Sequence, residues 1–259
     1  MSVLASISIG PNPRPRRLMI YGTAGIGKSS FGTCAPTPVV IQTEDGLGEI
    51  DCHKFPVATT LDSVMAAIGA LYREDHTYRT VVLDSLDWLE RLIWAAVCQA
   101  RMVTTLEDIG YGKGYLIALQ HWRELLDGLT ALRDERGMTI ILIAHARIER
   151  FENPETDPYD RYVPRLHKTA AAVVTEWCDE VLFASYKVFT KGTDEGFNRT
   201  RVQALGTGER VLRTTERPSH LAKNRLGLPD ELPLAWSEIA RFLPGAVPSP
   251  APSTTITSH

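Results

Sequence analysis

The sequence predicts an α/β fold in which a mainly parallel sheet carries helices on both faces. Short apolar runs rich in β-branched residues alternate along the chain with longer segments of helical periodicity. These runs lack the polar alternation of a half-exposed strand, which is typical of parallel strands buried between helices. The chain has 259 residues, 44% of them hydrophobic, so it is long enough to bury such a core in one large domain.

Five apolar runs are the predicted strands of the central sheet. They cover residues 17–21, 38–42, 80–84, 138–144 and 180–186. Between them, apolar residues recur at helical spacing and predict three further elements. These helices cover residues 61–72, 86–101 and 113–136, and the last is followed by Gly137, a residue type that commonly ends helices.

The pattern changes after residue 186. Short apolar runs surround turn residues at 191–196 and 206–208, which predict β-hairpins that extend the domain toward its C-terminus. The last segment is rich in Pro, Ser and Thr and poor in large apolar residues, so we expect a disordered tail. The predicted organisation is an N-terminal arm over 1–16, a folded domain over 17–243 and a tail over 244–259.

Composition and charge exclude several classes of protein. The net charge of −3 argues against a protein that coats nucleic acid with its whole surface, so contact with DNA requires a local basic patch. The four cysteines are scattered, which is typical of reduced thiols and gives no zinc framework. No apolar run is long enough to cross a bilayer. The apolar N-terminal residues are followed by Pro and Arg rather than by a cleavage site, so we do not expect a secretion signal. We expect a cytoplasmic protein without a membrane partner.

A glycine-rich segment directly after the first predicted strand matches the phosphate-binding loop, in which two glycines separated by four residues precede Lys and Ser. Such glycines let backbone N–H groups surround phosphates, while Lys28 supplies positive charge and Ser29 offers a hydroxyl to Mg²⁺. The residues expected to hold ATP are Gly22, Thr23, Ala24, Gly25, Ile26, Gly27, Lys28, Ser29 and Ser30. The alternative is a chance glycine-rich turn, against which the spacing, the Lys, the hydroxyl and the preceding strand all argue.

An acidic residue ends the predicted strand 80–84 and supplies the partner that Mg²⁺ needs. Asp84 is expected to hold the metal together with Ser29. The alternative role for Asp84 is to cap the helix that follows it. The next residue is Ser85 rather than the Glu that many ATPases place there, so the group that orients water must come from another strand.

Glu44 is the predicted catalytic base. It follows the strand 38–42 at its carboxyl end, which is the side of an open α/β sheet where ligands bind. A solvated loop carboxylate is the alternative, with Asp45 or Glu49 as substitutes. His145 directly follows the strand 138–144, and we expect it to sense the γ-phosphate. Its alternative is a histidine that is merely held in place by hydrogen bonds.

With these features the chain resembles the RecA-like branch of phosphate-loop ATPases, and in particular the phage-encoded AAA-type proteins that include Sak-type single-strand annealing ATPases. The resemblance covers about residues 17 to 235. It rests on the segments 22–29, 43–44, 82–85, 110–115, 144–145 and 222–229. It implies a RecA-like ATPase domain with ATP and Mg²⁺ as cofactors, working in the cytoplasm of a bacterial host.

The last of these segments is similar to the Lys-Asn-Arg-Phe-Gly motif of RadA, with Leu226 in place of Phe. The resemblance implies that Lys223 and Arg225 reach the ATP site of a neighbouring subunit and stabilise charge on the transferred phosphoryl group. It therefore implies a homo-oligomer, either a ring or a short filament. An exposed basic turn without a catalytic role is the alternative.

The resemblance also implies contacts with single-stranded DNA from two loops, over about 104–115 and 147–168. The candidate residues are Lys113, Arg147, Arg150, Arg161, Arg165 and Lys168. Aromatic residues between these arginines suit base stacking beside phosphate contacts. An equal number of acidic residues in the second loop favours the alternative of an ordinary, self-paired loop. The segment 110–115 is either a binding turn with Lys113 at its apex or the boundary of a helix.

We therefore expect an ATPase, stimulated by DNA, that acts on single strands in phage recombination or replication. Annealing or regulated binding fits better than full strand exchange, because the chain has no room for the extra modules of RecA. A single-strand-binding or replication protein is an expected partner. The second hypothesis is an ATP-dependent protein-interaction switch, such as a helicase loader without direct DNA contact. A small-molecule kinase is a third, for which Lys223 and Arg225 have no evident use.

Overall fold

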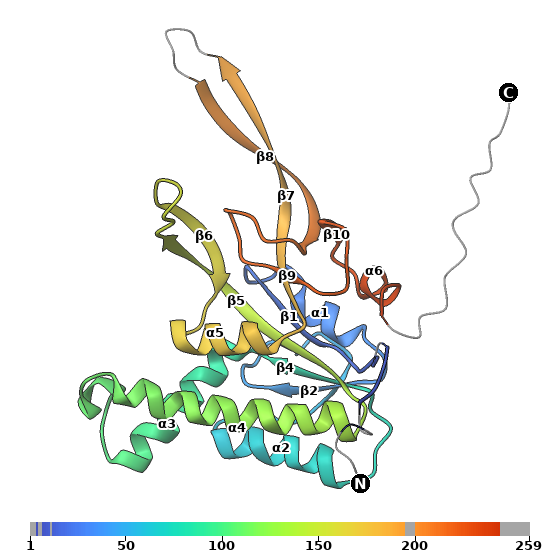
Figure 1. The fold of residues 1–259 in the computed structure, drawn as a ribbon, viewed down its shortest axis with the longest axis vertical. Coiled ribbons are helices and arrows are strands. Elements are labelled where there is room, and N and C mark those ends of the chain that lie inside the picture. The colour runs from blue at the N-terminus through green and yellow to red at the C-terminus, as the bar shows by residue number, and fades with distance from the viewer. Residues whose placement is uncertain (1–3, 5–6, 11, 195–199, 244–259) are drawn as a thin grey trace, which may run out of the picture.

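The computed structural model describes residues 4, 7–10, 12–194 and 200–243, and it confirms the predicted α/β architecture (Figure 1). The expected tail, 244–259, lies outside the described residues, as do parts of the expected arm. The helices are α1 (Lys28–Thr33), α2 (Leu61–Arg73), α3 (Leu86–Arg101), the short 3₁₀ helix η2 (Leu106–Ile109), α4 (Lys113–Glu135), α5 (Lys168–Trp177) and α6 (Trp236–Ala240). The strands are β1 (Arg17–Gly22), β2 (Pro38–Gln42), β3 (His53–Lys54), β4 (Thr80–Asp84), β5 (Thr139–Phe151), β6 (Tyr159–Pro164), β7 (Glu180–Asp194), β8 (Thr200–Arg213), β9 (Lys223–Asn224) and β10 (Glu231–Pro233).

The order of the strands places the functional residues. The sheet runs β10-β8-β7-β1-β5-β4-β2-β3, and its section from β7 to β3 is parallel throughout. The carboxyl ends of parallel strands meet at one edge, which here carries Gly22, His145, Asp84 and Gln42. Because β5 lies between β1 and β4, His145 is directly opposite Gly22, while Asp84 is one strand further away.

The two faces of the sheet have separate cores. Along β1, Met19 and Tyr21 pack under α2, α3, α4 and α5, whereas Leu18 and Ile20 face α1 and α6 (Figure 1). All four side chains are fully buried, and each such burial contributes about 1.5–3 kcal/mol. The face under α1 is also covered by the C-terminal segment that carries β10, so residues far apart in the sequence together enclose the phosphate loop.

Two of the predicted strands continue well beyond their apolar runs. The strand predicted at 138–144 extends to Phe151 because its outer half pairs with β6 as a hairpin. The strand predicted at 180–186 extends to Asp194 because it pairs with β8 in a long hairpin that projects from the body (Figure 1). Polar side chains and exposed apolar ones, such as Ile148 and Val188, follow these apolar runs. Pairing with a neighbouring strand, rather than burial, therefore holds these residues in strands.

The prediction of a turn at 206–208 is wrong. These residues lie within β8, where the pairing register with β7 shifts between Tyr186 and Val188. Gly208 has a φ of 76°, in the left-handed region, so the glycine supports an irregularity inside a strand and not a turn between strands. Of the other predicted turn, 191–196, residues 191–194 lie within β7, and residues 195–196 lie outside the described part of the chain.

Candidate active site

The loop between β1 and α1 has backbone conformations that favour its glycines. Gly25 and Gly27 have φ values of 74° and 105°, in the left-handed region. At Gly22 an added Cβ atom would lie 2.3 Å from the carbonyl oxygen of Ala184 on β7, so close packing of two strands excludes a side chain there. Three glycines of the motif are therefore required by the geometry of the loop, which argues against a chance glycine-rich turn.

Lys28, the first residue of α1, is a buried cation at the carboxyl edge of the sheet. Only 6% of the residue is exposed, and its Nζ donates hydrogen bonds to the carbonyl oxygens of Gly22 at 3.3 Å and Thr23 at 2.9 Å. Burial lowers the pKa of Lys28, and the charges of nearby acids, first among them Asp84, oppose that shift. The ammonium group is thus held inside the loop. Burial disfavours its protonated form, and a bound anion would stabilise that form.

Ser29 and Asp84 join the loop to β4. The Ser29 hydroxyl donates a hydrogen bond of 2.6 Å to Oδ2 of Asp84, which is 5% exposed. Burial raises the pKa of Asp84, and the hydrogen bond from Ser29 opposes this only in part. A hydroxyl and a carboxylate side by side are the oxygen ligands that Mg²⁺ takes beside phosphate. Among the described residues no cluster of three or more His, Cys, Asp or Glu could hold a metal ion.

A pair of hydrogen bonds fixes β2 against β4 at this edge. The Thr43 hydroxyl donates to the carbonyl oxygen of Ser85 at 2.7 Å and accepts from the Ser85 backbone N–H at 2.9 Å. The Thr43 backbone N–H donates to the carbonyl oxygen of Asp84 at 2.7 Å. Glu44 follows directly, so its carboxylate leaves the sheet at a position set by the neighbouring strand. Ser85 also occupies the N-cap of α3, so Asp84 is not the capping residue.

Of the side chains predicted for catalysis, Lys28, Glu44 and His145 meet in one cavity of about 320 Å³. Its lining residues come from the phosphate loop, from the ends of β4 and β5 and from the segment after β2. They are Gly25, Gly27, Lys28, Ser29, Ser30, Glu44, Gly46, Ile50, Asp84 and His145. Glu44 is half-buried and faces the same space as Lys28 and Asp84. The structure thus places a cation, two carboxylates, a hydroxyl and an imidazole around a space of the size that a polyphosphate needs.

Asp87, which the sequence analysis did not single out, positions His145. Its carboxylate accepts hydrogen bonds from the His145 backbone N–H at 3.1 Å and lies 3.0 Å from Nδ1 of the ring. The guanidinium of Arg165 pairs with the other oxygen of Asp87. Burial favours the neutral acid, but the hydrogen bonds from His145 and Arg165 hold the pKa of Asp87 well below its ordinary value. An ionised Asp87 keeps Nδ1 as a donor, which leaves Nε2 of His145 for the cavity.

One turn further along α3, Glu90 holds the segment that follows Arg165. Its two oxygens accept the backbone N–H of His167, at 3.1 and 2.8 Å, and burial raises its pKa to about 7. The His167 ring stacks on Tyr115 of α4, with ring centroids 4.2 Å apart. The start of α5 is therefore fixed to α3 and α4. Asp87 and Glu90 of α3 thus connect His145, at the cavity, to the two segments predicted to contact DNA.

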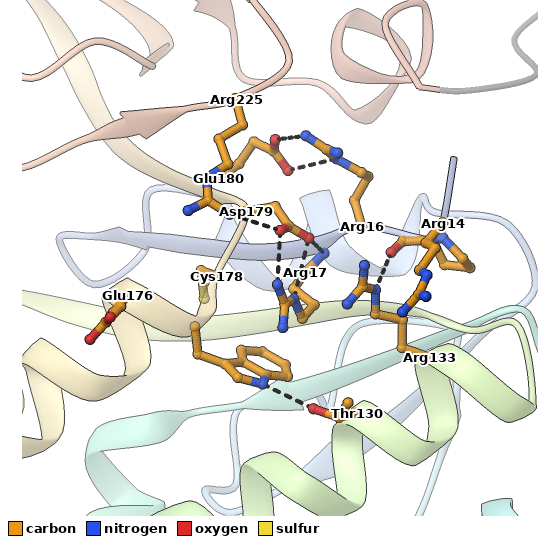
Figure 2. A network of polar contacts seen from close by, with 12 residues as sticks. Arg14, Arg16, Arg17, Thr130, Arg133, Glu176, Cys178, Asp179, Glu180 and Arg225 are labelled. Atoms are coloured by element: carbon orange, nitrogen blue, oxygen red, sulfur yellow. Dashed lines mark hydrogen bonds and ion pairs between the residues drawn. The ribbon is translucent and has the colours of Figure 1, made fainter. Parts of the chain in front are cut away.

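Lys223 and Arg225 lie at the opposite, amino edge of the sheet. Figure 2 shows Arg225 beside Asp179 at this edge. Lys223 pairs with Val181 near the start of β7, and its Nζ donates hydrogen bonds to the carbonyl oxygens of Thr175, Glu176 and Cys178 at the end of α5. Arg225 is half-exposed and lies 3.6 Å from Asp179. Neither side chain reaches the cavity of its own chain, so a role in hydrolysis requires a second copy.

The predicted DNA loop 147–168 is mostly the β5–β6 hairpin, and acids lie beside most of its arginines. The pairs are Arg147 with Glu149, Arg150 with Glu152 and Asp160, Arg161 with Glu216, and Arg165 with Asp87. Arg161 also lies 3.9 Å from the ring centre of Phe151. Lys168 begins α5 and Lys113 begins α4, so Lys113 is a helix boundary and not the apex of a turn.

The apex is instead Tyr111, a residue that the sequence analysis missed as a candidate. Gly110, Tyr111 and Gly112 all have positive φ, at 75°, 50° and 69°, and Tyr111 is fully exposed. A bulky residue in the left-handed region is uncommon and marks a position for functional attention. A second missed residue is Arg210 of β8, whose guanidinium lies over the phosphate loop, 3.4 Å from the carbonyl oxygen of Ile26. A Gly-Tyr-Gly sequence is a signal for the first, whereas nothing near Arg210 in the sequence indicates its place.

The comparisons with known proteins agree with this geometry. A family model described as AAA domain matches residues 14–226, which is more than half of the chain. That match indicates nucleotide binding, normally with Mg²⁺, and nucleoside triphosphatase activity in general. No curated protein matches the sequence. Among the described residues, the helices are too short or too polar to span a membrane.

Proposed function

The chain belongs to the AAA domain family, and on that premise we propose that it is an Mg²⁺-dependent ATPase that acts on single-stranded DNA. The observation that carries the proposal is the cavity in which Lys28, Ser29, Glu44, Asp84 and His145 meet. The role of annealing or regulated strand binding in phage recombination or replication follows from the resemblance to Sak-type ATPases.

Each side chain of the cavity has a distinct task in hydrolysis. Lys28 and the loop amides hold the β and γ phosphates, and Ser29 and Asp84 supply oxygen ligands to Mg²⁺. Mg²⁺ held by these two side chains would neutralise charge on the phosphate oxygens. Glu44, from the neighbouring strand, orients and deprotonates the attacking water. His145 contacts the γ-phosphate through the ring nitrogen that Asp87 leaves free.

The cavity of one chain contains Lys28 as its cation, and the second cation comes from a neighbouring copy. Arg225 is half-exposed at the amino edge of the sheet, where a head-to-tail contact would bring it to the carboxyl edge of the next protomer. Arg225 suits this role better than Lys223, whose ammonium is occupied by three carbonyl oxygens of its own chain. We therefore propose a ring or short filament with Arg225 acting in trans.

The surface near the start of α4 supports the DNA proposal best. Tyr111 is fully exposed at the apex of a turn, and Lys113 and Leu116 are exposed directly after it. An aromatic ring beside a cation suits stacking on bases together with phosphate contact. The stacked pair of Tyr115 and His167 connects this turn to the hairpin that carries Arg161.

The test is ATP hydrolysis measured with and without single-stranded DNA over a range of protein concentrations. We expect DNA to stimulate hydrolysis and specific activity to rise steeply with concentration, because two copies complete each site. Tyr111→Ala should weaken single-strand binding by about tenfold, from the loss of one stacked base, while Tyr72→Ala, an exposed tyrosine of α2, should not. If the specific rate of ATP hydrolysis changes neither with DNA nor with protein concentration, the DNA and oligomer proposals are rejected and nucleotide binding is unaffected.

A second candidate function is a protein-interaction switch without DNA contact. The observation that favours it is the pairing of Arg147, Arg150 and Arg161 with acids, which leaves little net charge on the hairpin for phosphates. Arginines whose charge is already neutralised by acids would contribute little to the binding of DNA phosphates. Absence of single-strand binding by a protein that hydrolyses ATP would favour this function over the first.

A further inference from the structure

A second cavity adjoins the phosphate loop on the side away from Glu44. It has a volume of about 370 Å³ and shares two residues, Gly27 and Ser30, with the cavity that holds the catalytic side chains. Its remaining walls are Phe31 of α1, Cys34 directly after that helix, Arg210 of β8 and the segment 234–237. A ligand that leaves the phosphate loop past Ser30 therefore enters this second space directly.

The floor of this second cavity is apolar and firmly built. Trp236 packs edge-on against Phe31 with ring centroids 5.6 Å apart, and both residues are buried. The Leu234 backbone N–H donates to the carbonyl oxygen of Arg210 at 3.0 Å, and β10 pairs with β8 just beside it. The cavity thus has a fixed shape, since one wall belongs to the sheet and the opposite wall to α1.

Arg210 supplies the polar group of this cavity. Its guanidinium lies directly over the loop, because an added Cβ at Gly27 would come within 2.8 Å of its Nη1 atom. A planar cation at the rim of an apolar space suits an aromatic ring that carries a phosphate chain, since guanidinium groups stack on ring faces and attract anions.

We propose that this cavity binds the nucleoside of the nucleotide whose phosphates occupy the phosphate loop, with Arg210 stacked on the base. The inference rests on the proposed function and extends it to the other half of the substrate. The segment 234–237 lies beyond the part of the chain that the family model matches, which ends at residue 226. An apolar cavity with few polar groups holds a purine by stacking and discriminates weakly between adenine and guanine.

Cys34 provides a direct readout, because it lines the cavity and is an exposed free thiol. The alkylation rate of each cysteine is measured by peptide mass spectrometry, with Mg²⁺ and either ATP or inorganic tripolyphosphate. ATP at ten times its Kd should slow alkylation of Cys34 about tenfold, because about a tenth of the protein remains free. Tripolyphosphate should leave the rate at Cys34 nearly unchanged, and Cys98 on α3 is the internal reference for both.

Substitutions distinguish binding of the nucleoside from binding of the phosphates. Arg210→Ala should weaken ATP binding about tenfold, from the loss of one cation–aromatic contact, and leave tripolyphosphate affinity within about twofold. Ser237→Tyr, which fills the cavity from an exposed position, should have the same selectivity. Arg241→Ala is the matched control, because this arginine lies near the same segment, pairs with Glu238 and does not line the cavity.

Equal protection of Cys34 by ATP and tripolyphosphate would overturn the inference. Equal loss of affinity for both ligands in Arg210→Ala would also overturn it, since Arg210 would then act on the phosphates. In either case binding of tripolyphosphate keeps the phosphate-loop proposal intact. A protein that binds neither ligand would instead reject the proposed function itself, and this inference with it.

Discussion

Asp84 and Asp179 are equally buried, with 5% of each residue exposed, yet they lie at opposite edges of the sheet in opposite electrostatic situations. Asp179 accepts hydrogen bonds from the backbone N–H and the guanidinium of Arg17, at 3.1 and 3.0 Å, and Arg225 lies 3.6 Å away (Figure 2). Burial alone would raise its pKa, but these contacts lower it. Asp84 accepts a hydrogen bond from the Ser29 hydroxyl, and burial raises the pKa of Asp84.

The difference shows how to tell a structural acid from a site. At the amino edge the fold itself compensates the buried charge, so the network around Asp179 is complete without a ligand. At the carboxyl edge compensation is partial, and a cation would complete it. The two aspartates are thus equally buried and differ in the number of hydrogen-bond donors around the carboxylate. That number decides which carboxylate is left to bind a ligand.

The largest expected effect tests whether the amino edge of one copy contacts the carboxyl edge of the next copy in an assembly. Arg225→Ala should lower ATP hydrolysis about 10³-fold if the arginine acts in trans, and Lys28→Ala should lower it about 10²-fold or more. An equimolar mixture of the two variants should recover about a quarter of the wild-type rate, because random head-to-tail mixing leaves that share of sites with both residues.

The control for complementation is Arg217→Ala, another exposed arginine, which pairs with Asp230 and should retain full activity alone. A mixture of the Lys28 and Arg225 variants that stays inactive would contradict the contact between edges. Normal activity of Arg225→Ala alone would do the same.

The next largest effect compares the two aspartates in stability. Asp179→Asn should lower the free energy of unfolding by about 3 kcal/mol, because it leaves the partly buried guanidinium of Arg17 without its carboxylate partner. Asp84→Asn should leave stability unchanged or raise it, since it removes a buried charge with few donors, while it abolishes Mg²⁺-dependent hydrolysis. Urea unfolding measures both. Asp134→Asn, at a more exposed ion pair, should change stability by less than about 0.5 kcal/mol, and equal losses for Asp84 and Asp179 would break the comparison.

The pH dependence of stability extends the comparison to Glu90. Burial raises the pKa of this carboxyl from 4.5 to about 7, so the folded state holds the proton more tightly than the unfolded chain. The free energy of unfolding should therefore fall as pH rises from 4.5 to 7, by about 2 kcal/mol from this group. Glu90→Gln cannot titrate and should remove that part of the slope in urea unfolding at several pH values. A variant with the wild-type slope would show that Glu90 is ionised throughout.

The smallest effect tests Asp87 as a positioning residue. Asp87→Asn should lower kcat about tenfold and leave the KM for ATP nearly unchanged, because it weakens the orientation of His145 without touching the phosphate loop. The double variant with His145→Ala should lose little more than His145→Ala alone, since both changes remove one contact. Asp127→Asn, an exposed acid of α4, is the control. Full additivity of the two changes would indicate that Asp87 acts elsewhere.

Local pattern predicted some elements to the residue. The strand expected at 80–84 and the helix expected at 86–101 agree with β4 and α3. Here a β-branched apolar run gives way to an amphipathic period, so the information lies within a few neighbouring residues. The outer halves of β5 and β7 could not be predicted in this way, because they are not continuous buried apolar runs and pairing with β6 and β8 holds them as strands.

Local sequence likewise predicted some residues of the candidate site and not others. Lys28, Ser29, Asp84, Glu44 and His145 could be named because each follows a recognisable strand or belongs to a known loop pattern, and the structure brings all five together. Asp87 and Arg210 could not be named. Asp87 acts on a residue 58 positions away, and Arg210 lies against one 184 positions away, and no local signal encodes such a distance.

The sequence alone determined the class of fold, the phosphate loop and the acids that follow the strands, because periodicity, glycine spacing and strand ends are properties of short segments. Only the tertiary structure decided that β5 separates β1 from β4, that Asp179 is neutralised while Asp84 is not, and that the C-terminal segment closes a cavity beside the loop. These features depend on which distant segments pack together, since burial and the supply of hydrogen-bond donors arise only when the sheet is assembled.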